Sequence, residues 1–304
     1  MSQLNWTEAQ WNTVNSAITE EFTKANVAGA CLPCYGPVGV STEAVSKQRI
    51  SYGDGIEPRI RILDDETTPF WTIRTYVELN GPQVADETLT SALFAFKRAA
   101  NLLARTEDYL VFVGNDHEAM GAPSAMQHEP KIPTSFPAKL LHLLDTPKHK
   151  APGLLTHPET AANCIPKPAS SAASLTSKSP GETLVKLIAE AISELEKNGH
   201  SGPFACVLGQ NAFLEAQTPN GSLVLPADRI TPMLGGALLR SGSMPEDSGV
   251  VVSSGGESID LVVATPPKAQ FLHVNQDAKY VFRVYERFVL RIKDAGAVVP
   301  IKLA

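Results

Sequence analysis

The chain has 304 residues, of which 43% are hydrophobic and 19% are charged, and its formal net charge is −6. This mixture is typical of a globular protein with one large domain or two smaller ones. The negative charge argues against nucleic acid as the main partner, because phosphate binding needs a basic face. No apolar run reaches the roughly 20 residues that span a bilayer, and the first residues lack the pattern of a signal peptide. We expect a cytoplasmic protein whose four cysteines stay reduced.

A helix is predicted near the N-terminus, ending close to Asn26. Thr7 and Gln10 have the spacing of a capping box, in which each side chain bonds the backbone of the other residue. Residues 27–40 are punctuated by proline and glycine and are predicted to be extended. The apolar residues of the helix recur on one face at the helical period: Trp11, Val14, Ile18 and Phe22.

Two predicted strands, 59–62 and 71–79, form a long hairpin around an acidic turn at 64–66. Apolar and polar residues alternate along both strands, as expected when one face is buried. An isolated two-stranded ribbon is marginal in water and needs a surface to lie against. A second chain is one source of such a surface.

A long helical pattern runs from Asp86 to Val113. At 1.5 Å per residue it would extend roughly 40 Å, which suits a structural spine. Residues 115–180 then change character, because they hold ten of the 23 prolines and five of the seven histidines. Such a stretch buries too little apolar surface to form its own core. We predict a largely irregular surface insertion with one short helix near 137–145.

Order resumes at Ser179, which is predicted to cap a helix that Asn198 and Gly199 stop. A buried strand, a short helix and a tight turn follow over residues 204–222, and the last third is rich in strands. The chain closes on a strand from Tyr280 with an apolar tail, which needs cover.

Cys31-Leu-Pro-Cys34 is the sharpest local candidate for chemistry. A CxxC motif lowers a thiol pKa when it begins a helix beside a cation. Here the motif is predicted to follow a helix and to lie in a strand, without a second CxxC to complete a zinc site. Two small apolar residues in a strand or turn is the favoured interpretation, and redox or metal chemistry is the alternative.

The acidic residues of the sequence are predicted to make structural contacts and not to take part in catalysis. Glu107 and Asp108 are adjacent on the long helix, so their side chains diverge by about 100° and do not share a substrate easily. We expect them to make a surface or interhelical charge contact. Glu286 interrupts an apolar strand face and must find a cationic or hydrogen-bonding partner, inside the chain or across an interface. His117–Glu118 and His128–Glu129 lie in the proline-rich segment, which is a poor support for metal ligands.

We expect no catalytic residue, no metal and no cofactor. The sequence has no P-loop, no HExxH and no GxSxG nucleophile elbow. Gly53-Asp-Gly55 lacks the third glycine of a dinucleotide-binding loop.

Eight segments, taken in order, resemble encapsulin shell proteins, and within them the linocin-like class whose subunits have the HK97 phage-capsid fold. The resemblance covers about residues 4–115 and 180–304, and the order of the segments is more specific than any one of them. The segments are WTEAQWNTVN, GPVGV, RTYVEL after the acidic hairpin, RTEDYLVFVG, GPFACVLG, TPNGSLVLPADRI, VVVSSGGESIDL and VYERFVLRIKDAGAVVPI.

The resemblance implies an α+β, HK97-like capsid fold with a P-domain, an E-loop and an A-domain. The implied divisions are an N-terminal helix and P-domain start at 1–46, an E-loop at 47–80, a P-domain spine helix at 81–114, the proline-rich insertion at 115–180, an A-domain at 181–245, and strands of both domains at 246–304.

It further implies a structural protein rather than an enzyme, which self-assembles into an icosahedral cytoplasmic nanocompartment around a cargo enzyme. The apolar C-terminal tail would then be packed within the shell wall. The cargo implied by the family is a dye-decolourising peroxidase or a ferritin-like protein, with no nucleic acid or membrane partner.

Three groups of site residues follow from the same resemblance. The cargo tail would bind at Trp11, Val14 and Ile18. The E-loop would contact neighbouring copies through Ile60, Ile62, Trp71 and Ile73. The pore loop would consist of Ala216, Gln217, Thr218, Pro219, Asn220, Gly221 and Ser222.

The sequence departs from the family in two places. The 115–180 insertion is longer than usual, and Ala264–Gln270, read as ATPPKAQ, replaces a Gly-Gln-Asp turn. A phage or prophage major capsid protein of the HK97 type is the alternative with the same fold. A thiol oxidoreductase using Cys31 and Cys34 is the alternative from another class.

Overall fold

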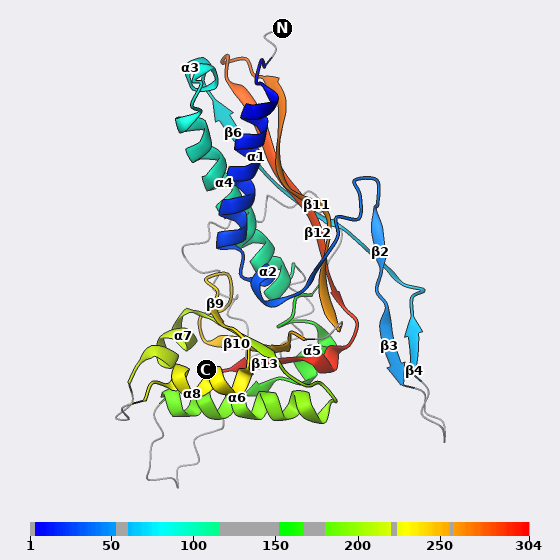
Figure 1. Ribbon diagram of the computed structural model, residues 1–304. Helices are drawn as coiled ribbons and strands as arrows, with labels where there is room; N and C mark the ends of the chain where they lie inside the picture. The colour runs from blue at the N-terminus through cyan, green and yellow to red at the C-terminus, as the bar shows by residue number, and fades with distance from the viewer. Residues whose placement is uncertain are drawn as a thin grey trace.

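The computed structural model describes residues 4–52, 60–115, 152–166, 180–219, 224–255 and 258–303. These residues form a mixed α+β structure with two sheets and a projecting ribbon (Figure 1). We call the three parts the long sheet, the five-stranded sheet and the arm. The long sheet and its helices stand above the five-stranded sheet, and the arm extends to one side.

The long sheet contains β1 (Cys34–Tyr35), β11 (Ile259–Val274), β12 (Tyr280–Ile292) and β6 (Trp71–Leu79), in that order. β11, β12 and β6 are antiparallel neighbours, and β1 runs parallel to β11. The register between β11 and β12 shifts between Thr265 and Lys268, where two prolines interrupt the strand. Because proline has no N–H to donate to the ladder, the ATPPKAQ sequence produces an irregularity here.

Helices α1 (Glu8–Ala25) and α4 (Thr90–Phe112) lie side by side on one face of the long sheet (Figure 1). The predicted capping box of α1 is confirmed. The Thr7 N–H donates to Gln10 Oε1 at 2.9 Å, and the Gln10 N–H donates to Thr7 Oγ1 at 3.3 Å. The helix ends directly before Asn26, as expected.

The segment after α1 was predicted to be extended, but its first part is helical. Residues Ala28–Cys31 form a helical turn, α2. The Asp108 side chain on α4 accepts hydrogen bonds from the N–H groups of Val27 at 2.9 Å and Ala28 at 2.8 Å. A residue about 80 positions away therefore caps this turn, and no local pattern in the sequence could have shown it.

The long helix α4 begins at Thr90, four residues later than predicted. Asp86 accepts hydrogen bonds from the N–H groups of Thr88 at 3.0 Å and Thr90 at 3.1 Å. Leu89 has a φ of +52° and a separate short helix, α3 (Gly81–Ala85), precedes it. The pattern from Asp86 thus contains a cap and a turn, and the helix itself spans about 35 Å.

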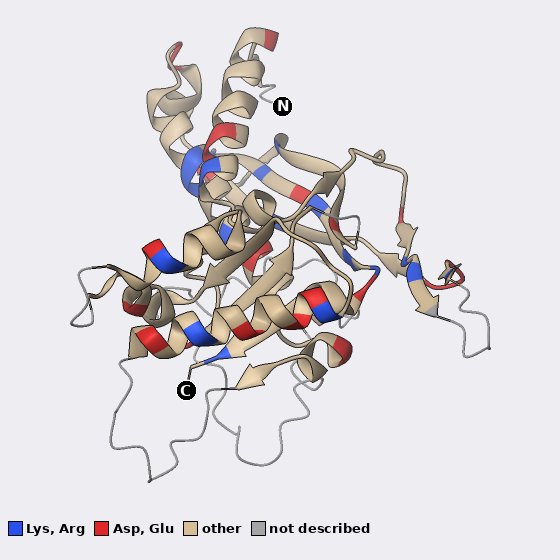
Figure 2. Ribbon diagram, turned by 60° about the horizontal axis from the view of Figure 1, so that its bottom comes forward, with Lys and Arg blue, Asp and Glu red and all other residues tan. Residues whose placement is uncertain are grey.

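The five-stranded sheet has the order β7 (Ile165–Pro166), β13 (Val298–Lys302), β10 (Ser248–Ser253), β8 (Phe204–Leu208) and β9 (Leu238–Arg240). A second apolar core joins it to α6 (Pro180–Lys197), α7 (Gln210–Gln217) and α8 (Pro226–Leu234). The α6 helix stops as predicted, with Gly199 at a φ of +86°. Acidic and basic residues alternate along the outer side of α6 (Figure 2). One such pair is Lys186 and Glu190, whose Nζ and Oε1 atoms are 3.3 Å apart.

The predicted closing strand is in fact two strands that belong to different sheets. β12 ends at Ile292, a 3-10 turn at Ala295–Ala297 redirects the chain, and β13 enters the five-stranded sheet. Val298, Val299 and Ile301 are fully buried. The apolar ending is therefore covered by its own chain, and its cover does not depend on a neighbouring copy.

The arm is a ribbon of residues 44–69, which differs from the predicted hairpin. Its strands pair as β2 (Ala44–Ser46) with β5 (Thr67–Pro69) and β3 (Arg49–Tyr52) with β4 (Ile60–Leu63). The other predicted hairpin strand, β6, pairs with β12 in the long sheet. Alternation identifies a strand but does not determine its partner, so the predicted pairing was wrong.

Part of the predicted surface insertion is integral to the fold. Leu154 is fully buried, and its N–H donates to Val111 O on α4 at 2.8 Å. α5 (Pro158–Ala162) follows, and β7 pairs in parallel with β13. The prediction of an irregular surface segment is therefore wrong for residues 152–166, and the short helix predicted at 137–145 lies outside the described residues.

We predict that Leu154→Ala lowers the free energy of unfolding by about 2–4 kcal/mol, because it removes a fully buried side chain and leaves a cavity. Chemical denaturation followed by tryptophan fluorescence measures the change. Leu214→Ala is the matched control, because Leu214 is 51% exposed and its truncation should cost under about 0.5 kcal/mol. Equal effects of the two substitutions would contradict the burial of Leu154.

Candidate functional site

The arm exposes apolar side chains that its own chain does not cover. Ile60 is 72% and Ile62 is 66% exposed, and Leu63 beside them is 46% exposed. Trp71 and Ile73, which were grouped with them as contacts to a neighbour, are 1% and 0% exposed in the core of the long sheet. That assignment is corrected for Trp71 and Ile73, because β6 belongs to the long sheet and turns these side chains towards α4.

The N-terminal helix turns its apolar stripe inward. Val14 and Ile18 are completely buried between α1, α4 and β11, so neither side chain offers a surface to another molecule. Their assignment as cargo contacts is therefore corrected. Trp11 is half-buried and packs edge-on against Trp6, with ring centroids 5.1 Å apart, and Trp6 stacks on Phe282 at 4.9 Å. Of the three expected residues, Trp11 alone keeps part of its surface accessible.

The expected pore loop follows α7. Ala216 is fully buried in the second core, so its assignment to a pore lining is wrong. Gln217, Thr218 and Pro219 are exposed at the end of α7. Asn220, Gly221 and Ser222 lie outside the described residues.

The two cysteines of the CxxC motif lie in unlike environments. Cys31 ends α2 and is buried, and burial raises the pKa of its thiol well above the usual value. Cys34 is exposed on β1, yet partial burial and the nearby carboxyl groups of Glu107 and Asp260 raise its thiol pKa. Arg291 and Lys293 line the same pocket as Cys34, but within the described part of the chain no cation lowers the pKa of either thiol towards the reactive thiolate.

Glu286 finds an unexpected partner in Glu107. Both are buried, at 2% and 3% exposure, where β12 packs against α4, and their side chains are hydrogen-bonded to one another. Burial and the charge of Glu107 raise the pKa of Glu286 well above its usual value. Glu107 also accepts a hydrogen bond from Asn26, so we assign the shared proton to Glu286 and the charge to Glu107.

Sequence reasoning identified Glu286 as needing a partner but expected the contact of Glu107 to involve the surface or another helix. A protonated carboxyl group can donate a hydrogen bond to a second carboxyl group, but residue spacing does not show which two distant acidic residues meet. The signal that could have joined the two is their position, each on the inner face of a core element. Asp108, next to Glu107, caps α2 instead of reaching the surface.

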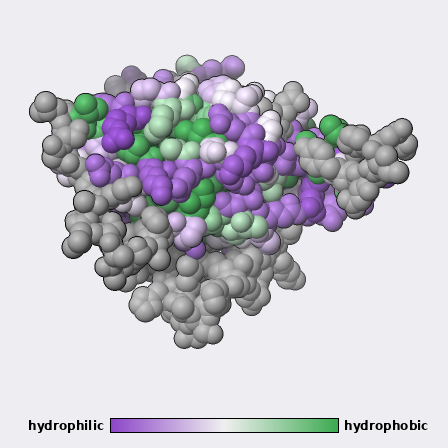
Figure 3. All heavy atoms as spheres, turned by 90° about the horizontal axis from the view of Figure 1, so that it is seen from below, coloured by the Kyte–Doolittle hydropathy of each residue, from purple (hydrophilic) through white to green (hydrophobic). Residues whose placement is uncertain are grey.

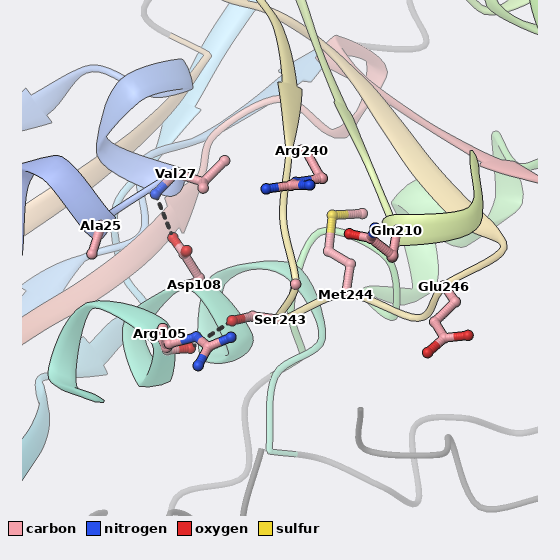
Figure 4. A pocket seen from close by; sticks show the side chains of 10 residues that line it. Ala25, Val27, Arg105, Asp108, Gln210, Arg240, Ser243, Met244 and Glu246 are labelled. Atoms are coloured by element: carbon pink, nitrogen blue, oxygen red, sulfur yellow. Dashed lines mark hydrogen bonds between the residues drawn. The ribbon is translucent and has the colours of Figure 1, made fainter. Parts of the chain in front are cut away.

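A cavity of about 360 Å³ lies where α4 meets the loop between β9 and β10 (Figure 4). Arg105 approaches it from α4 and Arg240 from β9, and Asp108 and Glu246 also line it. The Ser243 hydroxyl donates to the backbone oxygen of Arg105 at 3.0 Å across this junction. Because its charges are of both signs, the cavity favours neither anions nor cations, and its hydrogen bonds tie the two halves of the molecule together.

The underside of the five-stranded sheet is mixed in polarity. Figure 3 shows hydrophilic residues interspersed with smaller hydrophobic patches over its described part. Among the described residues, no three potential metal ligands gather in one place. No helix in that same set is long and apolar enough to cross a membrane.

Comparison with known proteins relates almost the whole chain to one family. A family model described as encapsulating protein for peroxidase matches residues 2–144 and 165–289. Over 112 residues the chain is 33% identical to the type 1 encapsulin shell protein of Myxococcus xanthus, which covers 36% of this chain and 39% of that protein. The alignment thus spans less than two thirds of this curated relative.

Solved structures share the fold over nearly the full length. A virus-like particle from Pyrococcus furiosus superposes with a TM-score of 0.66 and 15% identity, covering 97% of this chain and 100% of that one. The capsid of Myoviridae phage XM1 superposes with a TM-score of 0.57 and 14% identity, covering 91% and 90%. At such identities the likeness concerns the fold alone, and the predicted α+β, HK97-like capsid fold is confirmed.

We predict that Glu286→Gln flattens the pH dependence of stability. Because the folded state raises the pKa of Glu286, its stabilising contribution is complete below the unfolded value of about 4.3 and is lost as pH rises through the folded value. The amide still donates to Glu107 but has no proton to lose. At pH 9 the variant should therefore be more stable than wild type, and the difference between the two should shrink as pH falls towards 5.

Thermal unfolding between pH 5 and pH 9, in one assembly state, measures this effect. Glu190→Gln on the exposed side of α6 is the control and should leave the pH profile unchanged. If Glu286→Gln keeps the wild-type profile, the two carboxyl groups do not share a proton.

We also predict slow alkylation of Cys34 at neutral pH. A raised pKa lowers the thiolate fraction about ten-fold per unit, and the thiolate is the reacting species. Iodoacetamide labelling followed by mass spectrometry should show a rate at Cys34 that still increases above pH 9, and Cys34→Ser should remove the labelled peptide. A rate that levels off below pH 8 would support the thiol oxidoreductase hypothesis instead.

Proposed function

Because the chain belongs to the encapsulin family of encapsulating proteins, we propose that many copies of it assemble into a closed icosahedral shell around a cargo enzyme in the cytoplasm. The observation that carries this proposal is the arm, which projects from the body with Ile60 and Ile62 largely exposed (Figure 1). A two-stranded ribbon with bare apolar side chains is marginal in water. Closed symmetry would give every such ribbon a neighbour to lie against.

The three parts of the molecule match the proposed division of a shell subunit. The long sheet with α1 and α4 would be the P-domain, and the five-stranded sheet with its helices would be the A-domain. The arm would be the E-loop, with its bounds moved from 47–80 to residues 44–69. Gln217, Thr218 and Pro219, exposed beyond the A-domain core, would approach the pore.

The proposed cargo site centres on Trp11 and the aromatic rings around it. Trp6, Phe271 and Tyr280 are also partly accessible, and they pack beside the buried Phe282. Large rings that are half-buried supply rigid apolar contact area for a docking segment at a low entropic cost. A dye-decolourising peroxidase is the first cargo we propose, in keeping with the description of the family, and a ferritin-like protein is the second.

We further propose that the shell protein itself has no active site. Its buried acidic groups, Glu107 and Glu286, bond to each other in the core instead of facing a substrate. A major capsid protein of an HK97-type phage is the second candidate, and the similar fold of the phage XM1 capsid favours it. The presence of a packaged enzyme rather than DNA in purified particles distinguishes the two.

The test of assembly is size-exclusion chromatography with negative-stain electron microscopy of the purified protein. We expect hollow, uniform spheres eluting near the void volume. A well-folded monomer at micromolar concentration would overturn the proposal.

Replacing Ile60 and Ile62 by Asp should abolish the spheres while leaving the far-ultraviolet circular dichroism of the subunit unchanged, because both side chains lie outside its cores. The matched control replaces both by Val, which keeps the apolar surface and should keep the spheres. Spheres that persist in the Asp variant would show that the arm is not the assembly contact.

A further inference from the structure

The face of the long sheet that is turned away from α1 and α4 is half covered by the chain itself. Val38 and Val45, from the segment that leads into the arm, pack on a small cluster around Val262 and Val289. Arg287 donates to the backbone oxygens of Val40 at 2.5 Å and Thr42 at 2.9 Å, which holds this segment on the sheet. Beyond Arg287, none of the described residues of this hydrophobic cluster covers the face, and Tyr76 and Gln270 on it are exposed.

The open half of this face carries cations and aromatic rings in register, and we call it the basic face. The pairing of the strands sets two rows across the sheet: Arg74, Tyr285 and Lys268, and then Tyr76, Arg283 and Gln270. The Arg283 guanidinium lies 4.4 Å from the centroid of the Tyr285 ring, and the Lys268 ammonium lies 5.6 Å from it. Tyr76 is 52% exposed.

The cations of the basic face outnumber its carboxylates. Among the described residues, neither Lys268 nor Arg283 pairs with an acidic group, and Arg283 donates to Gln270 Oε1 at 2.6 Å. The Glu78 carboxylate lies at one end of the face and is held by Lys279 at 3.6 Å. Figure 2 marks Lys and Arg along the strands of the sheet. A cation above an aromatic ring keeps its other side available for an anion. In a chain with a net charge of −6, this is a local surface of the opposite sign.

The arm carries the complementary surface at the turn between β4 and β5. Within the described ranges, Asp64 and Asp65 have no cationic partner, whereas Glu66 next to them is paired with Lys47 at 2.5 Å. Ile62 and Leu63, which precede the turn, are exposed. The turn therefore presents two carboxylates directly beside two bare apolar side chains. Figure 1 shows the arm pointing away from the long sheet, and Asp64 and Asp65 are both exposed.

We propose that the acidic turn of one copy docks on the basic face of a neighbouring copy. Asp64 and Asp65 meet Lys268 and Arg283, and Ile62 lies against the exposed Tyr76 ring. This inference rests on the proposed shell, which supplies the neighbour, and it names the two surfaces that join. A nucleic acid is the less suitable occupant, because the negative charge of the whole chain repels a polyanion, whereas two local carboxylates match the small size of the face.

The test is a charge exchange between the two surfaces. Lys268→Glu alone places like charges together, and so does Asp65→Lys alone, and each should remove the shell peak at a concentration where wild type assembles. The double variant, Asp65→Lys with Lys268→Glu, restores opposite charges and should recover the peak. Glu196→Lys on exposed α6 is the matched charge-reversal control and should assemble normally.

The outcomes separate this inference from the proposed function. Single variants that assemble like wild type, or a double variant that stays dissociated, overturn the docking while wild-type shells still support the assembly. A wild type that forms no shells overturns the assembly itself. Loss of polyanion binding in Lys268→Glu without any loss of assembly would assign the basic face to nucleic acid instead.

A disulfide trap keeps the inference testable if a charge variant misfolds. Asp65→Cys combined with Gln270→Cys, oxidised in the assembled state, should give covalent ladders of two and more chains on non-reducing gels. Asp65→Cys alone, or paired with Gln217→Cys at the end of α7, should remain a single band. Absence of the ladder from intact shells would overturn the docking.

Discussion

The long sheet has two faces, and this chain covers one of them fully and the other only in part. Helices α1 and α4 bury the inner face around Phe96, Phe282 and Phe288, and that burial fixes where α2, the arm and the loop before β10 attach. The segment that covers the outer face stops at Arg287. A two-stranded arm with exposed apolar residues leaves from the same region. The subunit therefore has a partly covered sheet face and an arm that needs a surface to pack against. In the shell that we propose for this member of the family, neighbouring copies would join the two.

Patterns within one segment predicted much of this fold, whereas contacts between distant segments escaped them. The Thr7 capping box and the glycine stop of α6 depend on residues a few positions apart, and both were correct. The partner of β6 and the split of the final strand depend on pairings across the chain, which alternation leaves open. Of the candidate site, Ile60 and Ile62 are exposed on the arm and their contact with a neighbouring copy stays a prediction, while Val14, Ile18, Trp71, Ile73 and Ala216 proved to be core residues.

The Glu107–Glu286 pair places an ionisable contact in the middle of the wall that we propose. Burial and the hydrogen bond to Glu107 raise the pKa of Glu286 well above its usual value, and loss of its proton would add a negative charge away from water. The pair joins α4 to β12, the two elements that carry the inner face. Its protonation therefore acts on the part of the molecule that supports both the arm and the aromatic cluster around Trp11.

The position of β13 sets the order of events during synthesis. This strand lies between β7 and β10, and it contributes Val299 and Ile301 to the second core. Until residues 298–302 have left the ribosome, one edge of β10 is unpaired and part of the apolar face of α6 is uncovered. The arm, by contrast, emerges early with its apolar residues already exposed. Neighbouring nascent chains on one messenger RNA thus carry an aggregation-prone arm before residues 298–302 have completed the second core. A chaperone that binds the arm during translation would prevent such aggregation.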